Sequence, residues 1–286
     1  DTARRDSATV LSPVTVEVSR IAGSRATAPY AVYHRSRASI PDGTPATALD
    51  EALRTIPGVQ VDNRYNYALG ERISIRGAGA RAQFGVRGIR VLVDGIPATL
   101  PDGQTALNLV DLATVHAAEV LRGPVSSLFG NAAGGAILLE TAPPPAGRFA
   151  PRATVTAGSN GLLRTLGAVG GTHGRFGYVA SGSRVAYDGF RSHSDAENTY
   201  ASARLTWAGA RDVLGASFNS VRYDARNPGS LSDSLLRVDR NRAFQNNVAQ
   251  GTGETGSQRQ GGAHWRRALS GPRHGGFGRI FIHFKF

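Results

Sequence analysis

A glycine pattern at the end of a predicted strand has the spacing that could bind a nucleotide. The predicted strand at residues 73–76 leads into Gly77-Ala-Gly79-Ala-Arg-Ala82, and Asp94 ends a later strand. In dinucleotide-binding folds, G-x-G-x-x-A opens a helix whose N-terminus holds the pyrophosphate, and a later acid binds the ribose. Here Gly85 and Gly88 interrupt the residues that should form that helix, and the acid comes slightly early. We therefore disfavour a dinucleotide-binding enzyme.

No other group of residues has the spacing of a catalytic or metal site. The pair Ser126-Ser127 lacks the flanking glycines of a nucleophile elbow. The seven histidines are scattered without metal-ligand spacing, among them His34, His116, His173 and His193. The chain has no cysteine, which excludes disulfides, thiolate metal sites and a cysteine nucleophile. We expect a protein that is not an enzyme and that carries no cofactor and no metal.

The charge of the chain is strongly basic but scattered. The formal net charge is +12, and Lys285 is the only lysine among 33 basic residues. Such a balance can indicate nucleic-acid binding, but it can also reflect a coding bias towards arginine. The longest basic runs are the pairs at residues 4–5 and 266–267, so we expect no nucleic-acid-binding tail. No stretch has the ~18 consecutive apolar residues of a transmembrane helix, although membrane strands carry a weaker signal.

The first half of the chain has the pattern of a small mixed α/β domain. Residues 44–56 combine helical spacing of apolar residues with a capping-box pattern of Thr47 and Asp50, and Pro57-Gly58 ends the predicted helix. The three prolines at 143–145 can continue neither a helix nor a strand ladder, so they predict a domain boundary. Short strands are predicted at residues 59–61, 72–76, 90–94, 117–121 and 136–139.

After the prolines the pattern changes to long alternating strands. Serial strands of about ten residues joined by short turns are typical of a transmembrane β-barrel. Residues 227–260 are polar and rich in Asn, Gln and Arg, which favours an external loop. A soluble β-sandwich is the alternative that the alternation leaves open. The alternating segments are residues 152–157, 163–170, 176–187, 199–207 and 213–223.

Seven motifs in the first 142 residues resemble those of TonB-dependent outer-membrane receptors and occur in that family's order. They are a strip at residues 13–18, a helix ending in Ile56-Pro-Gly-Val59, Ile73-Ser-Ile-Arg-Gly77, Val91-Leu-Val-Asp-Gly-Ile-Pro97, Glu119-Val-Leu-Arg-Gly-Pro124, Leu128-Phe-Gly130 and Gly134-Gly-Ala-Ile137. Residues 150–265 resemble the opening strands of the family's barrel. The resemblance implies an α+β plug domain followed by antiparallel transmembrane β-barrel strands that form an incomplete barrel. The implied segments are a flexible N-terminus at 1–29, a plug at 30–142, a proline-rich linker at 143–149 and a partial barrel at 150–286.

The resemblance also implies which plug residues contact the barrel wall and the ligand. In the family, arginines at the positions of Arg76 and Arg122 pair with wall glutamates, and together with Glu119 they form the expected plug–barrel latch. Substrate contacts come partly from plug loops that face the outside, here residues 80–87 and 98–104. Arginine suits an anionic ferric siderophore because its planar fork binds a carboxylate at two points. The expected ligand contacts are Arg81, Gln83, Phe84, Arg87, Thr99, Asp102 and Gln104.

A β-prone strip near the N-terminus resembles the TonB box, the family's partner-binding segment. An isolated strip of this kind can also add as a strand to a partner's sheet. The resemblance implies TonB with its inner-membrane energising complex as partner, a ferric siderophore or similar large nutrient as substrate, surrounding outer-membrane lipid, and no nucleic acid. The implied function is energised uptake across an outer membrane, with the plug accessible from the periplasm. The strip consists of Pro13, Val14, Thr15, Val16, Glu17 and Val18.

The length of the chain differs from that expected for a complete receptor. At ~9–11 residues per strand, residues 150–286 allow about six to eight strands, whereas enclosing a plug takes ~22. We expect a premature end near residues 266–270, through a frameshift or fragmentary assembly, and a genuine terminal strand at residues 280–286 is the alternative. A second hypothesis for the function is a stand-alone, plug-like periplasmic module that binds TonB without transport.

Overall fold

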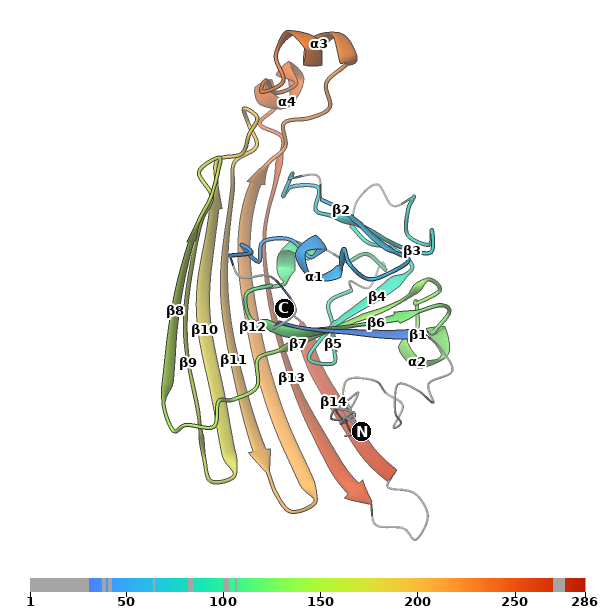
Figure 1. Cartoon of the computed structure of the whole chain (residues 1–286), viewed down its shortest axis with the longest axis vertical. Coiled ribbons are helices and arrows are strands. Elements are labelled where there is room, and N and C mark those ends of the chain that lie inside the picture. The colour runs from blue at the N-terminus through green and yellow to red at the C-terminus, as the bar shows by residue number, and fades with distance from the viewer. Residues whose placement is uncertain are drawn as a thin grey trace, which may run out of the picture.

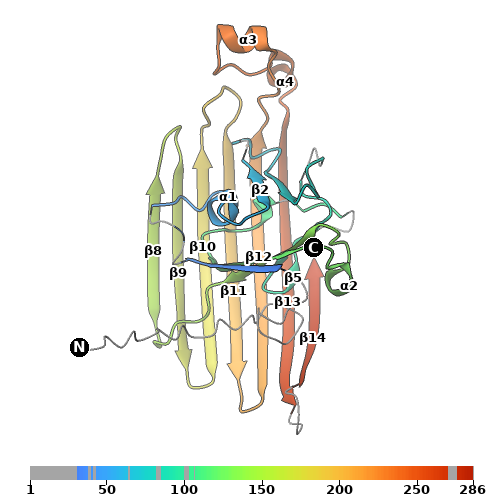
Figure 2. The same cartoon turned by 45° about the vertical axis from the view of Figure 1, so that its right-hand side comes forward.

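The computed structural model describes residues 31–37, 40, 43–63, 65–81, 85–99, 103–105, 107–269 and 276–285. The first half of the chain forms an α/β domain, which we call the plug and which ends before the three prolines. The second half, from residue 150 onwards, forms a curved antiparallel sheet, which we call the wall. The plug lies against the concave face of the wall (Figures 1 and 2).

The described part of the plug contains two β-sheets and several short helical turns. Its elements are β1 (Ala31–Ser36), α1 (Asp50–Leu53), β2 (Val59–Asp62), β3 (Arg72–Ile75), β4 (Ile89–Val93), β5 (Ile96–Pro97), η3 (Leu107–Leu109), β6 (Val115–Arg122), α2 (Ser126–Phe129) and β7 (Gly135–Thr141). The larger sheet has the order β1-β6-β7-β4-β5, in which β4 and β7 are parallel, and the smaller sheet pairs β2 with β3. The five short strands predicted between residues 59 and 139 are therefore present.

Two motifs of the sequence form tight turns in the plug. Arg76 and Gly77 follow β3 with φ of 50° and 85°, and Asp94 and Gly95 join β4 to β5 with φ of 50° and 82°. Positive φ at two successive residues suits a type I′ turn, which favours glycine and Asp-Gly. Residues 76–81 form turns and one bridge, so the described part of this stretch does not open the helix that a dinucleotide site needs.

The core of the plug is apolar and almost completely buried. Leu49, Leu53, Ile73, Val91 and Val120 belong to one cluster, and each is at most 1% exposed. Full burial of an aliphatic side chain of this size contributes ~1.5–3 kcal/mol relative to exposure. The plug therefore has the packing of a folded domain and not that of a loose insert.

The helix predicted over residues 44–56 is much shorter in the structure, where only α1 is helical. Ala46 has a left-handed φ of 54°, which interrupts helical geometry ahead of α1. The backbone N–H of Ala46 donates to Glu51 Oε2 at 2.6 Å, and those of Thr47 and Ala48 donate to Glu51 Oε1 at 3.0 and 3.2 Å. A glutamate therefore satisfies the amide groups that precede the helix, in place of the predicted capping box.

The wall is a single sheet of seven described strands in sequence order. They are β8 (Ala150–Ala157), β9 (Leu163–His173), β10 (Phe176–Tyr187), β11 (Ala196–Ala208), β12 (Asp212–Arg226), β13 (Gly253–Leu269) and β14 (Gly276–Lys285). Every neighbouring pair is antiparallel, and the number of strands falls within the predicted six to eight. β14 pairs with β13, so the strand pattern continues past the residues near which we expected it to break.

The two faces of the wall differ because successive residues of a strand point to opposite sides. On the concave side, Arg164, Ser183, Asn198 and Tyr200 are buried against the plug. The convex side is apolar near the short turns, which we call the turn end, and polar near the long loops, which we call the loop end. One cross-strand row at the turn end consists of Phe176, Trp207, Leu214 and Trp265, and one nearer the loop end consists of Arg184, Thr199, Arg222 and Ser257.

The long loop between β12 and β13 is ordered by an arginine clamp. It carries α3 (Asp233–Val238) and α4 (Gln245–Ala249) and ends where β13 begins, earlier than predicted. Arg191 Nη1 donates to the carbonyl of Gly229 at 2.8 Å, and Arg191 Nε donates to that of Arg242 at 3.1 Å. Figure 1 shows this loop standing above the wall. Among the described residues, no helix has the length and hydrophobicity to cross a membrane.

Candidate functional site

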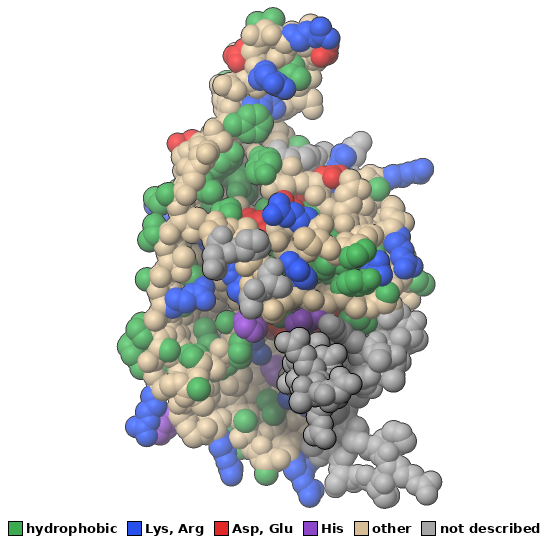
Figure 3. All heavy atoms as spheres, in the orientation of Figure 1, with side chains coloured by type: hydrophobic (Ala, Val, Ile, Leu, Met, Phe, Trp, Pro, Cys, Tyr) green, Lys and Arg blue, Asp and Glu red, His purple; other side chains and the backbone are tan. Residues whose placement is uncertain are grey.

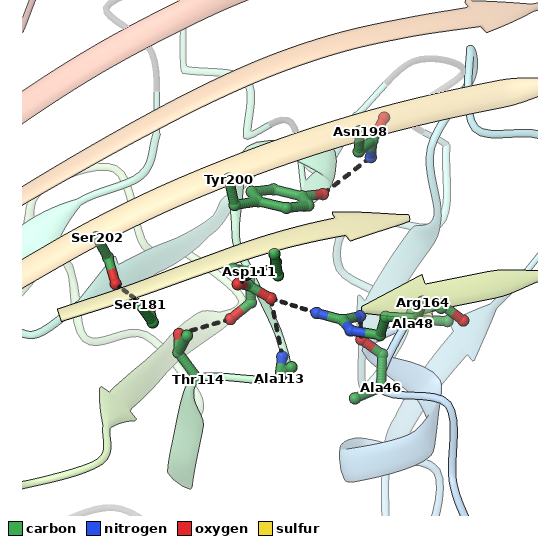
Figure 4. A network of polar contacts seen from close by, with 12 residues as sticks. Ala46, Ala48, Asp111, Ala113, Thr114, Arg164, Ser181, Asn198, Tyr200 and Ser202 are labelled. Carbon is green, nitrogen blue, oxygen red and sulfur yellow. Dashed lines mark hydrogen bonds and ion pairs between the residues drawn. The ribbon is translucent and has the colours of Figure 1, made fainter. Parts of the chain in front are cut away.

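The candidate functional site is the plug–wall interface, where a buried charge pair joins the two parts. Arg164 of β9 donates hydrogen bonds to Asp111 of the plug and to the carbonyl of Ala46 (Figure 4). Ser183 Oγ of β10 donates to the second carboxylate oxygen of Asp111 at 2.6 Å. The side chains of Arg164 and Asp111 are only 4% and 9% exposed. Two wall strands and two plug segments therefore meet at one salt bridge.

Both carboxylate oxygens of Asp111 accept hydrogen bonds from the wall. Besides the wall contacts, Asp111 Oδ1 accepts the backbone N–H of Ala113 at 3.1 Å. A buried ion pair costs desolvation energy, which is recovered only if the geometry is good and the remaining lone pairs are satisfied. The arrangement therefore favours one docked position of the plug and penalises any position that separates the two charges.

A second, looser pair joins the plug to β11. Arg204 Nη1 lies 3.4 Å from Asp94 Oδ1, and their side chains are 25% and 9% exposed. Thr141 holds Asp94 in place, because its backbone N–H and its hydroxyl donate to the two carboxylate oxygens at 2.9 and 2.7 Å. A cavity of about 50 Å³ adjoins the pair and is lined partly by Ser181 and Ser202. A cavity of this size is large enough for a water molecule, and the Arg204 side chain is more exposed than that of Arg164.

The plug also contacts the loop end of the wall. Asn66 Nδ2 donates to Asn227 Oδ1 at 3.1 Å, and the rings of Tyr67 and Tyr187 lie 5.6 Å apart. These contacts tie the plug segment between β2 and β3 to the ordered loop.

Glu71 lies beside a small cavity of about 40 Å³ between this plug segment and the wall residues Asn198 and Tyr200. Burial raises the pKa of Glu71 from 4.5 to about 7, although the backbone N–H of Leu49, which donates to it at 2.8 Å, acts in the opposite direction. Burial likewise raises the pKa of Tyr67 to about 12. The charge of Glu71 therefore changes near neutral pH.

The residues predicted to latch the plug lie away from these contacts. Arg122 donates to the carbonyl of Pro57 and to Tyr33 Oη, the latter at 2.9 Å, so its described contacts are within the plug. Arg76 is exposed, and Glu119 is buried in β6. The arginine–glutamate latch stays a prediction. The observed plug–wall pairs have the opposite polarity, with arginines on the wall and aspartates on the plug.

The two predicted ligand loops lie side by side in the plug. Val86 and Thr105 exchange backbone hydrogen bonds, both at 3.0 Å, which joins the end of the first loop to the end of the second. Thr99 is buried, with Oγ1 2.8 Å from Thr105 Oγ1, so it supports the loops and does not face solvent.

The remaining predicted ligand residues divide into exposed and undescribed positions. Arg81 and Arg87 are exposed, and Gln104 is half-buried. Gln83, Phe84 and Asp102 lie outside the described residues, as do all residues of the strip, Pro13, Val14, Thr15, Val16, Glu17 and Val18. In the described part of the chain, no group of three His, Asp or Glu side chains could hold a metal ion.

Sequence reasoning missed the charges that hold the plug. Asp111 lies in a largely apolar stretch, and nothing local marks it as a partner of the wall. The positions of Arg164 and Arg204 could have indicated such contacts, because each arginine lies on the plug-facing side of an alternating strand. A cation at such a position needs an anion from the enclosed domain.

Comparison with known proteins identifies the family of the plug. Residues 24–137 match the model of the TonB-dependent receptor plug domain. A hemin receptor of Yersinia enterocolitica is 28% identical over 71% of this chain and 31% of its own length. The vitamin B12 transporter BtuB of Photobacterium profundum is 30% identical over 48% of this chain and 22% of its own length. The chain thus spans about a third or less of the length of these relatives.

Solved structures of receptors share the fold of both plug and wall. FpvA of Pseudomonas aeruginosa, bound to pyoverdines, has a TM-score of 0.66 at 17% identity and covers 94% of this chain and 35% of its own. The ferric yersiniabactin uptake receptor FyuA of Yersinia pestis has a TM-score of 0.65 at 19% identity, over 84% of this chain and 38% of its own. The plug at residues 24–137 therefore belongs to the plug domains of TonB-dependent receptors, and plug and wall together have the fold of solved uptake receptors.

Proposed function

We propose that this chain supplies the plug and part of the wall of an outer-membrane receptor that takes up a ferric chelate with energy from TonB. The observation that carries the proposal is the plug docked on the concave face of the wall through the buried pair of Arg164 and Asp111. A plug held there obstructs the path along the wall until its contacts rearrange. Obstruction that can be released is what a gated uptake receptor needs.

A ferric chelate is the substrate class that the relatives and the plug surface favour. The hemin receptors of two Yersinia species match over 71% and 72% of this chain, whereas the vitamin B12 transporter of Photobacterium profundum matches over 48%. Arg81 and Arg87 are exposed cations of the first ligand loop, and arginine binds carboxylates and related anions at two points. We propose these two residues, with Gln104, as plug contacts to an anionic iron complex.

The uptake cycle that we propose uses no covalent chemistry. The chelate binds at the outer plug loops, and residues 13–18 then pair with TonB as an added strand. A pull from TonB rearranges the plug and separates Arg164 from Asp111. The short turns of the wall lie in the periplasm and the clamped loop lies outside, as is usual for barrels of this membrane.

Uptake measurements in iron-starved cells test the function. Deleting the gene should abolish accumulation of one ⁵⁵Fe-labelled complex, either hemin or a ferric siderophore, and deleting TonB should abolish it equally. Labelled cobalamin is the control substrate for the gene deletion and should enter those cells as before. Unchanged uptake of every ferric complex would overturn the proposal, and loss of cobalamin uptake alone would replace its substrate.

A deletion of residues 13–18 tests the assignment of the TonB-binding strip. The deletion should abolish TonB binding in a pull-down while ligand binding by the receptor remains. A variant that retains TonB binding would show that the strip is not the partner-binding segment.

A further inference from the structure

The convex face of the wall has an apolar groove at the turn end of β10 to β13. Its volume is about 720 Å³, within the ~300–1,000 Å³ range of ligand pockets. Ala216 and Ala263 are small side chains within this lining. The larger side chains that line it include Tyr178, Leu205, Trp207, Leu214 and Trp265. Leu205 is 61% exposed and Leu214 45%, which is unfavourable in water, so this face needs an apolar partner.

The turns directly beneath the groove are basic. Arg175 lies in the turn before β10 and Arg211 in the turn before β12, and both are exposed. The backbone N–H of Ala208 donates to the carbonyl of Arg175 at 2.9 Å, which places the two turns side by side. Arg267 lies at the same end, 3.8 Å from Asp212. Figure 3 shows Lys and Arg side chains at this lower end of the molecule.

We propose that this groove binds an acyl chain of a phospholipid with an anionic headgroup, which Arg175 and Arg211 contact. The inference rests on the proposed membrane location of the wall. An apolar groove next to exposed cations matches the chemistry of a single amphiphile. Its acyl chain would fill the groove, and its phosphate would face the turns. The indole N–H of Trp265 donates to Asp212 at 2.9 Å, which fixes this side chain beside the groove. Each basic side chain at a membrane surface strengthens binding of anionic lipid about fivefold.

The chain contains its own probe for this site. It has only two tryptophans, Trp207 and Trp265, and both line the groove. Brominated acyl chains quench tryptophan only on close contact. We would reconstitute the full chain in phosphatidylcholine vesicles and titrate in brominated phosphatidylglycerol or brominated phosphatidylcholine. With two arginines at about fivefold each, brominated phosphatidylglycerol should reach half-maximal quenching at a mole fraction about 25-fold lower than brominated phosphatidylcholine.

Two variants and one matched control make the test specific. The double variant R175Q/R211Q should remove most of the preference for the anionic lipid. Ala216→Phe, on the exposed convex face, should reduce contact quenching by filling the groove. Arg237→Gln removes one exposed arginine at the loop end, where it pairs with Asp233, and should change nothing.

The possible outcomes separate this inference from the proposed function. Equal quenching by the two lipids, or a preference that survives in R175Q/R211Q, overturns the anionic-lipid site and leaves the membrane location intact. No quenching by either lipid overturns both, because the convex face would then not contact the bilayer.

Discussion

Replacing Arg164 by methionine should loosen the plug from the wall. The arginine is 4% exposed and holds both Asp111 and the carbonyl of Ala46. Methionine retains much of the volume but removes the charge and the donors. The aspartate would then stay buried without its cation, which is the costly way to break an ion pair.

The free-energy cost of this substitution depends on the hydrogen bonds that Asp111 retains. Removing one partner of a buried pair costs ~3–5 kcal/mol. Here the carboxylate retains the hydroxyl of Ser183 at 2.6 Å and the N–H of Ala113 at 3.1 Å, which favours the lower end of that range. A loss of about 3 kcal/mol raises the population of the undocked plug about 150-fold.

Hydrogen exchange measured by mass spectrometry on the full chain reads this population directly. Amide protons of residues 44–53 and 107–115 should exchange about 150-fold faster in R164M, while those of β12 and β13 keep their rates. In a double-mutant cycle that combines R164M with D111N, the coupling free energy between Arg164 and Asp111 should exceed ~1.5 kcal/mol.

Arg184→Met provides the matched control, because the side chains of the Arg184–Glu197 ion pair are 59% and 50% exposed and such surface pairs contribute little to stability. Equal amide exchange rates of the plug residues in R164M and R184M would refute the view that the buried pair docks the plug.

Further predictions concern the pH dependence and the backbone of the plug. Because the pKa of Glu71 is raised to about 7, its protonated form adds stability that is complete below pH 4.5 and is lost as pH rises through 7. E71Q should therefore be more stable than the native chain above pH 7, by up to ~3 kcal/mol, and a melting-temperature difference that does not vary with pH would contradict this. Gly135→Ala should cost more than ~2 kcal/mol, since φ is 147° and a Cβ atom would lie 2.3 Å from the carbonyl oxygen of Leu121. Gly147→Ala, where a Cβ atom would meet nothing within 4 Å, is its control in thermal melts.

Local patterns were sufficient to predict most strands. The alternation at residues 176–187 gave the bounds of β10, and the Asp-Gly and Arg-Gly motifs marked the turns. The helix at 44–56 was overestimated because its left-handed Ala46 depends on Glu51 and on Arg164, which is distant in sequence. β13 was assigned partly to a loop because its first half, residues 253–262, is rich in Gly and Gln and lacks apolar alternation.

The candidate site was less accessible to sequence reasoning than the fold. The pairs of Arg164 with Asp111 and of Arg204 with Asp94 join residues 53 and 110 positions apart. Spacing rules describe neighbours along a helix or strand, and no such rule relates these positions. Only the placement of the plug on the concave face of the wall brings the charges together.

With the long loop outside the cell, as we propose, the clamp affects how antibodies would recognise it. Arg191 holds the carbonyls of Gly229 and Arg242 but lies in the preceding loop, outside residues 227–252. A synthetic peptide of those residues would lack the clamp and sample many conformations. Vaccination with the peptide should therefore raise sera that bind the denatured chain better than intact bacteria. An immunogen that displays both loops on their strands should raise sera with the reverse preference.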